Sequence, residues 1–201
     1  MVASAEAKLY SVTDLARGDD LPAALAAFAL SIIEGNPLTF VASFGNRSTP
    51  ETYRNLRKFF TYLHELVKER NYKKPDLLYG ADRRVQRLNQ PPEKLYTVPA
   101  NGIERLIHDD IVRGDKRLRR PEKHLQSANQ YPKIDEFIRF LSLASPTEIA
   151  IALQNIPDLK KVLSIVMMGG TIVEQGNVDP HVEANFSHDL LALQILLALV
   201  V

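Results

Sequence analysis

The chain alternates short apolar segments with segments that have a helical pattern, and this alternation constrains its fold more than any other feature. The apolar segments are short, rich in β-branched or aromatic residues, and bounded by polar turns. They predict five strands, at Lys8–Val12, Leu38–Phe44, Asp76–Tyr79, Phe137–Leu143 and Leu163–Met168. Strands that alternate with helices favour an α/β fold, so we predict a mainly parallel, Rossmann-like sheet with flanking helices.

The predicted helices carry start and stop signals. Pro22 stands where a first helical turn tolerates proline, and Gly35 supplies a stop, which predicts a helix over about 21–34. Serine and glutamate at capping-box spacing open a second helix at 48–51, running to about residue 70, and a third at 145–148, running toward the proline at 157. A last apolar helix is expected over about 190–201.

Length and composition indicate one ordinary globular body. The 201 residues predict a single domain over 1–201, and lysine plus arginine number 25 against 24 acids, a net charge of +1. This balance gives no electrostatic reason to expect a nucleic-acid or membrane partner. Without cysteine, the chain has no disulfides, thiolate nucleophile or cysteine-ligated zinc. The start lacks a secretory pattern, so we expect a cytoplasmic protein.

One long stretch lacks periodicity. From about residue 82 to 132 the sequence is rich in charge, proline and asparagine, and we interpret it as an irregular excursion. Within it, Arg113 to His124 carries six basic residues against two acidic ones. That run could bind a phosphate backbone, but it lacks interleaved aromatic residues, so we favour a solvated loop.

Polar side chains gather where the predicted strands end. Asp14, Asp19 and Asp20 follow the first strand, and Asn46 follows the second. In a parallel sheet these positions meet at one edge, where α/β proteins bind ligands. Three nearby carboxylates repel one another unless a cation or a proton compensates their charge, and oxygen donors suit calcium or magnesium. The alternative is that Asp19 and Asp20 only cap the following helix while Asp14 is solvated.

The segment GNVDPHVEANFSHD at 176–189 resembles the signature of the nucleoside hydrolase family, as does the preceding Met168-Gly169-Gly170. The likeness extends to SPTEIAIAL at 145–153, LLYGADRR at 77–84, FGNRSTPETYRN at 44–55 and TDLARGDDLPAALAAFAL at 13–30. It covers roughly three quarters of the chain. The 176–189 segment is its most specific part.

The resemblance implies hydrolysis of the N-glycosidic bond of a ribonucleoside by water that a bound Ca²⁺ activates. In this family pattern Asp14 is the catalytic base and a metal ligand, joined at the metal by Asp20 and by the backbone carbonyl of Thr147. The implied substrate-binding residues are Asp19, Asn46, Met168, Asn177, Glu183 and Asn185. The implied ligand is a ribonucleoside or a similar ribosyl compound.

The sequence also departs from the family pattern. Leu15 and Ala16 replace a Pro-Gly pair, and Glu148 replaces an asparagine. Val201 comes before the family's C-terminal portion, which supplies a further aspartate ligand and a histidine, so we expect a shortened domain. A noncatalytic ribosyl-binding or structural protein on the same scaffold is therefore an alternative to an enzyme. A generic phosphate-binding domain is a weaker one, since no glycine-rich phosphate motif occurs.

The last predicted helix, LLALQILLALVV, is apolar around its whole circumference. Such a helix should be buried on every side, and exposing it would leave a patch that promotes association. We therefore expect a homo-oligomer, with Leu193, Leu196 and Leu197 contributing to the contact.

Overall fold

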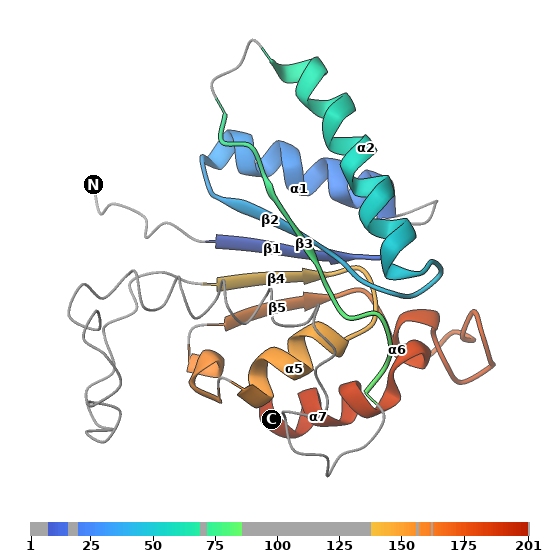
Figure 1. The fold of residues 1–201 in the computed structure, drawn as a ribbon. Coiled ribbons are helices and arrows are strands. Elements are labelled where there is room, and N and C mark those ends of the chain that lie inside the picture. The colour runs from blue at the N-terminus through green and yellow to red at the C-terminus, as the bar shows by residue number, and fades with distance from the viewer. Residues whose placement is uncertain are drawn as a thin grey trace, which may run out of the picture.

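The fold is a parallel five-stranded sheet with helices on both faces (Figure 1). This computed structural model describes residues 8–15, 20–68, 72–85, 138–155, 157–161 and 163–200. The strand order across the sheet is β3-β2-β1-β4-β5, with all four pairings parallel. The strands are β1 (Lys8–Thr13), β2 (Leu38–Ala42), β3 (Asp76–Tyr79), β4 (Ile138–Ser142) and β5 (Leu163–Met167). The predicted α/β class and all five strands are confirmed.

The carboxyl ends of four neighbouring strands lie level. Backbone hydrogen bonds continue the ladder one residue beyond each strand, from Ser43 N to Thr13 O (2.9 Å), from Leu143 N to Val12 O (2.7 Å) and from Met168 N to Ser142 O (2.8 Å). Because adjacent strands lie about 4.8 Å apart, residues that follow β1 and β5 stand about 10 Å apart on the same edge. A ligand the size of a nucleoside can reach both.

Helices α1 (Asp20–Glu34) and α2 (Thr49–Val67) pack on one face, over β1, β2 and β3. Gly35 takes a φ of +71° and ends α1 as expected. At the start of α2, the backbone N and the hydroxyl of Ser48 both donate to Glu51 Oε2, at 3.2 and 2.7 Å. The core beneath these helices is built around Phe28, Phe40 and Leu56.

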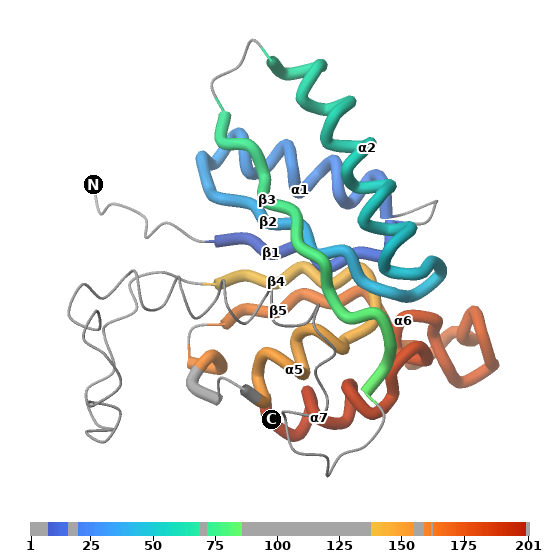
Figure 2. Tube along the Cα trace, in the orientation of Figure 1, coloured from blue at the N-terminus to red at the C-terminus, as the bar shows by residue number. Residues whose placement is uncertain are grey.

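The opposite face is covered by α5 (Thr147–Asn155), a 3-10 turn η1 (Pro157–Lys161) and α7 (Leu190–Val200), as Figure 2 shows in the same orientation. Its core includes Tyr10 stacked on Phe140, with ring centroids 5.1 Å apart, and the buried helix residues Ile149 and Leu153. Both faces of β2 are also covered, with Phe40 and Ala42 in the core under α1 and α2 and Val41 in the opposite core, which explains the continuous apolar run at its end.

Three sequence expectations need correction. A short helix, α6 (Ala184–His188), forms where only a loop was expected. The capping box expected at Ser145 and Glu148 does not form, because the Glu148 carboxylate accepts a hydrogen bond from the distant Ala81 N instead. The last helix is buried along one side only, since tight packing against α5 leaves its other side to solvent.

The role expected for Leu196 between chains is wrong for the same reason. Leu196 belongs to the chain's own core, together with Ala192 and Ile195. Leu193 is half-buried, and only Leu197 of the three expected contact residues is exposed. Among the described residues, no helix is long and apolar enough to cross a membrane. Most of the expected excursion, from residue 86 on, lies outside the described residues.

Candidate functional site

Asp14 is fully buried directly after β1. Its Oδ2 accepts a hydrogen bond from the backbone N of Asn46 (2.5 Å), and its backbone carbonyl accepts one from the Thr52 hydroxyl (2.7 Å). Its other carboxylate oxygen, Oδ1, is buried and has no hydrogen-bond partner in the described part of the chain. A buried carboxylate oxygen without a partner is costly, so this atom is suited to receive a cation or a proton.

The loop after β2 is built for a close approach to Asp14. A Cβ atom at Gly45 would collide with the Asp14 carboxylate, so the backbone reaches the aspartate only because residue 45 is glycine. The loop after β1 bends sharply as well, since Leu15 takes a φ of +26°, a conformation that leucine rarely adopts. Asn46 therefore meets Asp14 through its backbone, while its side chain is exposed.

The other two expected metal ligands lie at the starts of helices. Asp20 is buried at the start of α1, and Thr147 is buried at the start of α5. Asp19, which was expected to bind the substrate, lies outside the described residues. No group of three or more histidine, aspartate or glutamate side chains at metal-binding distance occurs among the residues that the structure describes. Calcium binding accordingly stays a prediction.

The expected ribose-binding residues come together around the start of α6. Glu183 accepts hydrogen bonds from three backbone N–H groups, those of Asn185 (2.9 Å), Phe186 (3.2 Å) and Gly170 (3.3 Å). The Asn185 side chain is buried and donates through Nδ2 to the Met168 carbonyl (3.0 Å). These bonds tie α6 to the carboxyl end of β5.

Asn177 joins the same cluster. Its Oδ1 accepts a hydrogen bond from the backbone N of Ala184 (2.8 Å), which closes the 176–183 loop onto α6. Each of these polar side chains is thus fixed by a local bond. Asn177 Nδ2 and Asn185 Oδ1 keep bonding capacity for a sugar hydroxyl.

Gly169 and Gly170 make room for the Phe186 ring. A Cβ atom at Gly169 would collide with that ring, and Gly170 takes a φ of +84°. These two glycines therefore do more than end a strand. They let α6 pack directly against the backbone that follows β5.

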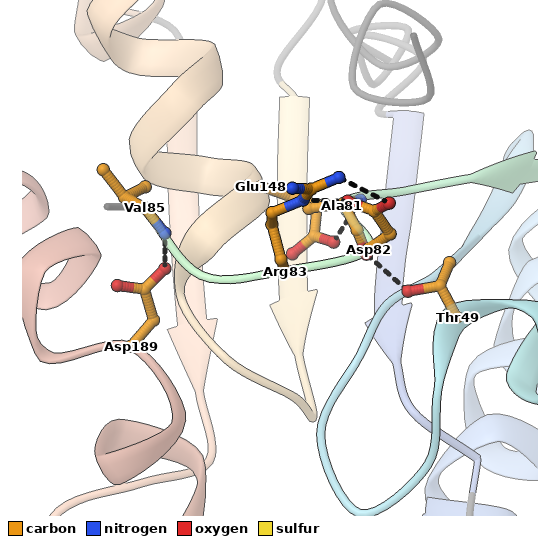
Figure 3. A network of polar contacts seen from close by, with 7 residues as sticks. All are labelled: Thr49, Ala81, Asp82, Arg83, Val85, Glu148 and Asp189. Atoms are coloured by element: carbon orange, nitrogen blue, oxygen red, sulfur yellow. Dashed lines mark hydrogen bonds and ion pairs between the residues drawn. The ribbon is translucent and has the colours of Figure 1, made fainter. Parts of the chain in front are cut away.

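Residues 80–85 cross the carboxyl edge and are held by two buried carboxylates (Figure 3). Glu148 Oε1 accepts from Ala81 N (3.0 Å), and Asp189 Oδ2 accepts from Val85 N (2.8 Å). Asp189 also accepts from the Thr147 hydroxyl (2.6 Å) and, through Oδ1, from Ala192 N (3.0 Å). Asp189 therefore joins three elements that are distant in sequence.

The two carboxylates differ in how completely they are bonded. Both oxygens of Asp189 are satisfied, whereas Glu148 Oε2 is buried without a partner in the described residues. Burial raises the pKa of Glu148 from 4.5 to about 7, opposed by the nearby Ser43 hydroxyl and by backbone donors and reinforced by the charge of Asp189. Near neutral pH, Glu148 is therefore partly protonated.

Sequence reasoning did not find these linking roles. In the sequence, Asp189 is only the last residue of the 176–189 signature, and Glu148 is only a departure from the family pattern. Their backbone partners lie 104 and 67 residues away in the chain, so no local pattern could reveal them.

A family model described as inosine-uridine preferring nucleoside hydrolase matches residues 13–200, nearly the whole chain. The chain belongs to this family. This match confirms the resemblance to nucleoside hydrolases that the 176–189 segment indicated. A comparison with curated proteins finds no match.

Solved structures of nucleoside hydrolases have the same fold. An inosine-guanosine nucleoside hydrolase superposes with a TM-score of 0.63 at 20% identity, over 95% of this chain and 58% of that one. A purine-preferring ribonucleoside hydrolase from Gardnerella vaginalis gives 0.57 at 20% identity, over 94% and 57%. An inosine-uridine preferring nucleoside hydrolase from Bacillus anthracis gives 0.57 at 17%, over 94% and 61%. This chain spans about three fifths of the length of these nucleoside hydrolases.

Proposed function

We propose that the carboxyl edge of the sheet is a metal-dependent ribonucleoside site, at which water cleaves the N-glycosidic bond. The observation that carries the proposal is the Asp14 carboxylate. It is fully buried, yet one of its oxygens has no partner in the described residues, in a chain whose residues 13–200 match the nucleoside hydrolase family. A ribonucleoside is also what the named substrates of the solved relatives have in common.

The metal that we propose is calcium. Asp14, Asp20 and the Thr147 carbonyl would hold it, because all three supply oxygen donors and calcium prefers oxygen. The unpartnered Asp14 Oδ1 fits such an ion, since a cation would compensate the cost of its burial. When bound, a divalent cation lowers the pKa of a coordinated water.

Asp14 is the proposed general base. The Asn46 backbone N–H fixes Oδ2, and the fully buried setting holds the carboxylate in one orientation, which leaves Oδ1 to accept a proton from water. The water oxygen bonds to the anomeric carbon as the carbon–nitrogen bond breaks. The nucleobase leaves with the bonding electron pair and takes up a proton from solvent. Carboxylates around the sugar stabilise the positive charge that develops on the ribosyl ring.

The residues around α6 are proposed to bind the ribose. Asn177, Glu183 and Asn185 present polar groups whose positions are fixed by their own hydrogen bonds, about two strands from Asp14. Met168 adds an apolar contact beside Asn185. Asp19 and the exposed side chain of Asn46 would complete the site from the β1 and β2 loops.

Hydrolysis tests this function directly. With inosine or uridine and millimolar calcium, we expect the 201-residue chain to release free base, detected by chromatography. Asp14→Asn should lower the rate by at least about 100-fold, because a positioned general base typically contributes that much. The matched control is Asp76→Asn. It changes an exposed aspartate at the amino end of β3, away from the carboxyl edge, and should leave the rate unchanged. No release by the parent chain, or equal rates with Asp14→Asn, would exclude the proposed reaction.

Sugar binding gives an independent prediction. Ribose added at millimolar concentration should shift the backbone amide NMR signals of residues 177–186, and Asn185→Ala should weaken this binding at least about tenfold, the effect of losing one buried hydrogen bond. Asn36→Ala, on an exposed hydrogen bond far from α6, is the control. Shifts confined to other segments would remove Glu183 and Asn185 from the site even if hydrolysis occurs.

A further inference from the structure

The peptide group that joins Asp14 to Leu15 is hydrogen-bonded at both ends by threonine side chains. Its carbonyl oxygen, which belongs to Asp14, accepts from the Thr52 hydroxyl at 2.7 Å. Its N–H, which belongs to Leu15, donates to Thr13 Oγ1 at 3.0 Å. Both threonines are fully buried, so water does not compete for either bond. Two side chains therefore fix the orientation of this one peptide group.

The same peptide group is held in a strained conformation. The φ of Leu15 is +26°, in the left-handed region that leucine rarely adopts. A strained backbone persists only where the surrounding contacts hold it, and such strain is concentrated at functional sites. Turning the peptide group would change the ψ of Asp14 and the φ of Leu15 together, and would let φ return to negative values. We expect this turn wherever one of the two threonine bonds is lost.

The Thr52 hydroxyl makes an unusual bond for a threonine inside a helix. Helical threonines often bond the carbonyl four residues earlier, and Thr61 of α2 does so with Arg57 O at 3.0 Å. Thr52 instead bonds a carbonyl 38 residues away in the chain. Thr49, one turn before it, reaches the Ala81 carbonyl in the same manner (Figure 3). The start of α2 therefore directs two buried hydroxyls at the carboxyl edge of the sheet.

The position of the Asp14 carboxylate depends on this peptide group. The side chain and the carbonyl of Asp14 start from the same Cα atom, so the Thr52 bond to the carbonyl also limits where the carboxylate lies. At the far end of the side chain, Asn46 N holds Oδ2. These two bonds together leave Oδ1 in one place, buried and without a partner in the described part of the chain. Neither bond uses Oδ1 itself.

We propose that Thr52 is a positioning residue for Asp14. Its hydroxyl, together with Thr13 Oγ1, holds the Asp14–Leu15 peptide group in its strained orientation and so keeps Oδ1 available for the metal and for the proton of water. This inference rests on the proposed function, which assigns Oδ1 to those two tasks. Thr52 acts only through the Asp14 backbone, because its hydroxyl bonds the carbonyl and not the carboxylate.

Calcium calorimetry and amide hydrogen exchange test this role. Thr52→Val keeps the shape of the side chain and removes the hydroxyl. It should weaken calcium binding at least about tenfold, the effect of one hydrogen bond. It should also speed exchange of the Leu15 amide at least about tenfold, because a turned peptide group loses the bond to Thr13 Oγ1. Thr52→Ser keeps a hydroxyl and should stay within about twofold of the parent chain in both measurements.

Kinetics with inosine separate positioning from substrate binding. Thr52→Val should lower kcat at least about tenfold while KM changes less than about threefold, because the ribose-binding residues around α6 are untouched. The matched control is Thr61→Val, which removes an exposed hydroxyl from the same helix and should leave calcium binding, Leu15 exchange and kcat unchanged. Circular dichroism checks folding. If Thr52→Val does not fold, Thr13→Val repeats the test, since it removes the acceptor at the other end of the peptide group.

The outcomes distinguish this inference from the proposed function. Calcium binding that Thr52→Val weakens no more than Thr61→Val does, or a Thr52→Ser variant as weak as Thr52→Val, would overturn the positioning role and leave the metal site standing. A Thr52→Val variant that only unfolds at lower urea, with unchanged calcium affinity and kcat, would make the bond merely structural. A parent chain that binds no calcium would exclude the metal site and, with it, the positioning of Asp14 for a metal.

Discussion

Replacing Asp189 by alanine is expected to lower the free energy of unfolding by about 4 kcal/mol, since each buried donor left unpaired costs about 1–3 kcal/mol. The Asp189 carboxylate accepts from Val85 N, Thr147 Oγ1 and Ala192 N, and all three bonds are buried. Alanine offers no acceptor to any of these donors. The same change would also release residues 80–85 from α7.

Urea unfolding measures this effect. A lower midpoint with an unchanged slope would show lost stability without a change in the unfolded state. Asp76→Ala, which removes an exposed aspartate, should stay within about 0.5 kcal/mol of the parent chain. A loss below 1 kcal/mol for Asp189→Ala would mean that water or a rearranged side chain replaces the carboxylate, and that Asp189 does not join the three elements.

Glu148→Gln is expected to stabilise the chain at alkaline pH. Burial raises the pKa of Glu148 from 4.5 to about 7, so the folded state binds a proton that the unfolded state has released. The stability that proton binding at Glu148 gives the folded state is therefore fully present below pH 4.5. It declines as the pH rises from there and is lost above about pH 7. The difference between the two pKa values corresponds to about 3 kcal/mol.

Glutamine suits the site because its Oε1 can accept from Ala81 N while its amide donates toward the Ser43 hydroxyl, which is buried without a partner in the described residues. Denaturant unfolding should show the variant and the parent similar at pH 4.5 and the variant about 3 kcal/mol more stable at pH 8.5. The exposed exchange Glu174→Gln should show no such divergence. Parallel stability curves for Glu148→Gln and the parent would contradict the burial of an ionisable carboxyl.

The sequence allowed the sheet to be predicted because the local signals agree. Each strand is a short apolar segment. Gly35 ends α1 through its positive φ, and the Ser48–Glu51 pair opens α2 through hydrogen bonds between residues three apart. The order of the strands follows from tertiary packing, which no local pattern encodes. Helix α6 escaped prediction because its five residues show no periodicity and its first turn is capped by Glu183, a residue type that is uncommon at that position.

The candidate site was predictable to a similar degree. The family signature led to Asn177, Glu183 and Asn185, which the structure brings together, and strand ends led to Asp14. The same rules failed at Glu148, where the capping-box spacing indicated a bond to Ser145 and the side chain instead reaches Ala81. A local bond to Ser145 within the first turn of α5 was outweighed by a buried backbone donor, Ala81 N, that needed an acceptor.

Calcium calorimetry tests the central claim, that Asp14 Oδ1, which has no partner in the described part of the chain, belongs to a metal site. We expect binding in the millimolar range, because Asp14, Asp20 and the Thr147 carbonyl leave much of a shell of about six to eight oxygens to water. Asp14→Asn and Asp20→Ala should each weaken binding at least about tenfold, while Asp76→Asn, an exposed site, should bind as the parent chain does. No heat at millimolar calcium, or unchanged binding in Asp14→Asn, would contradict the account.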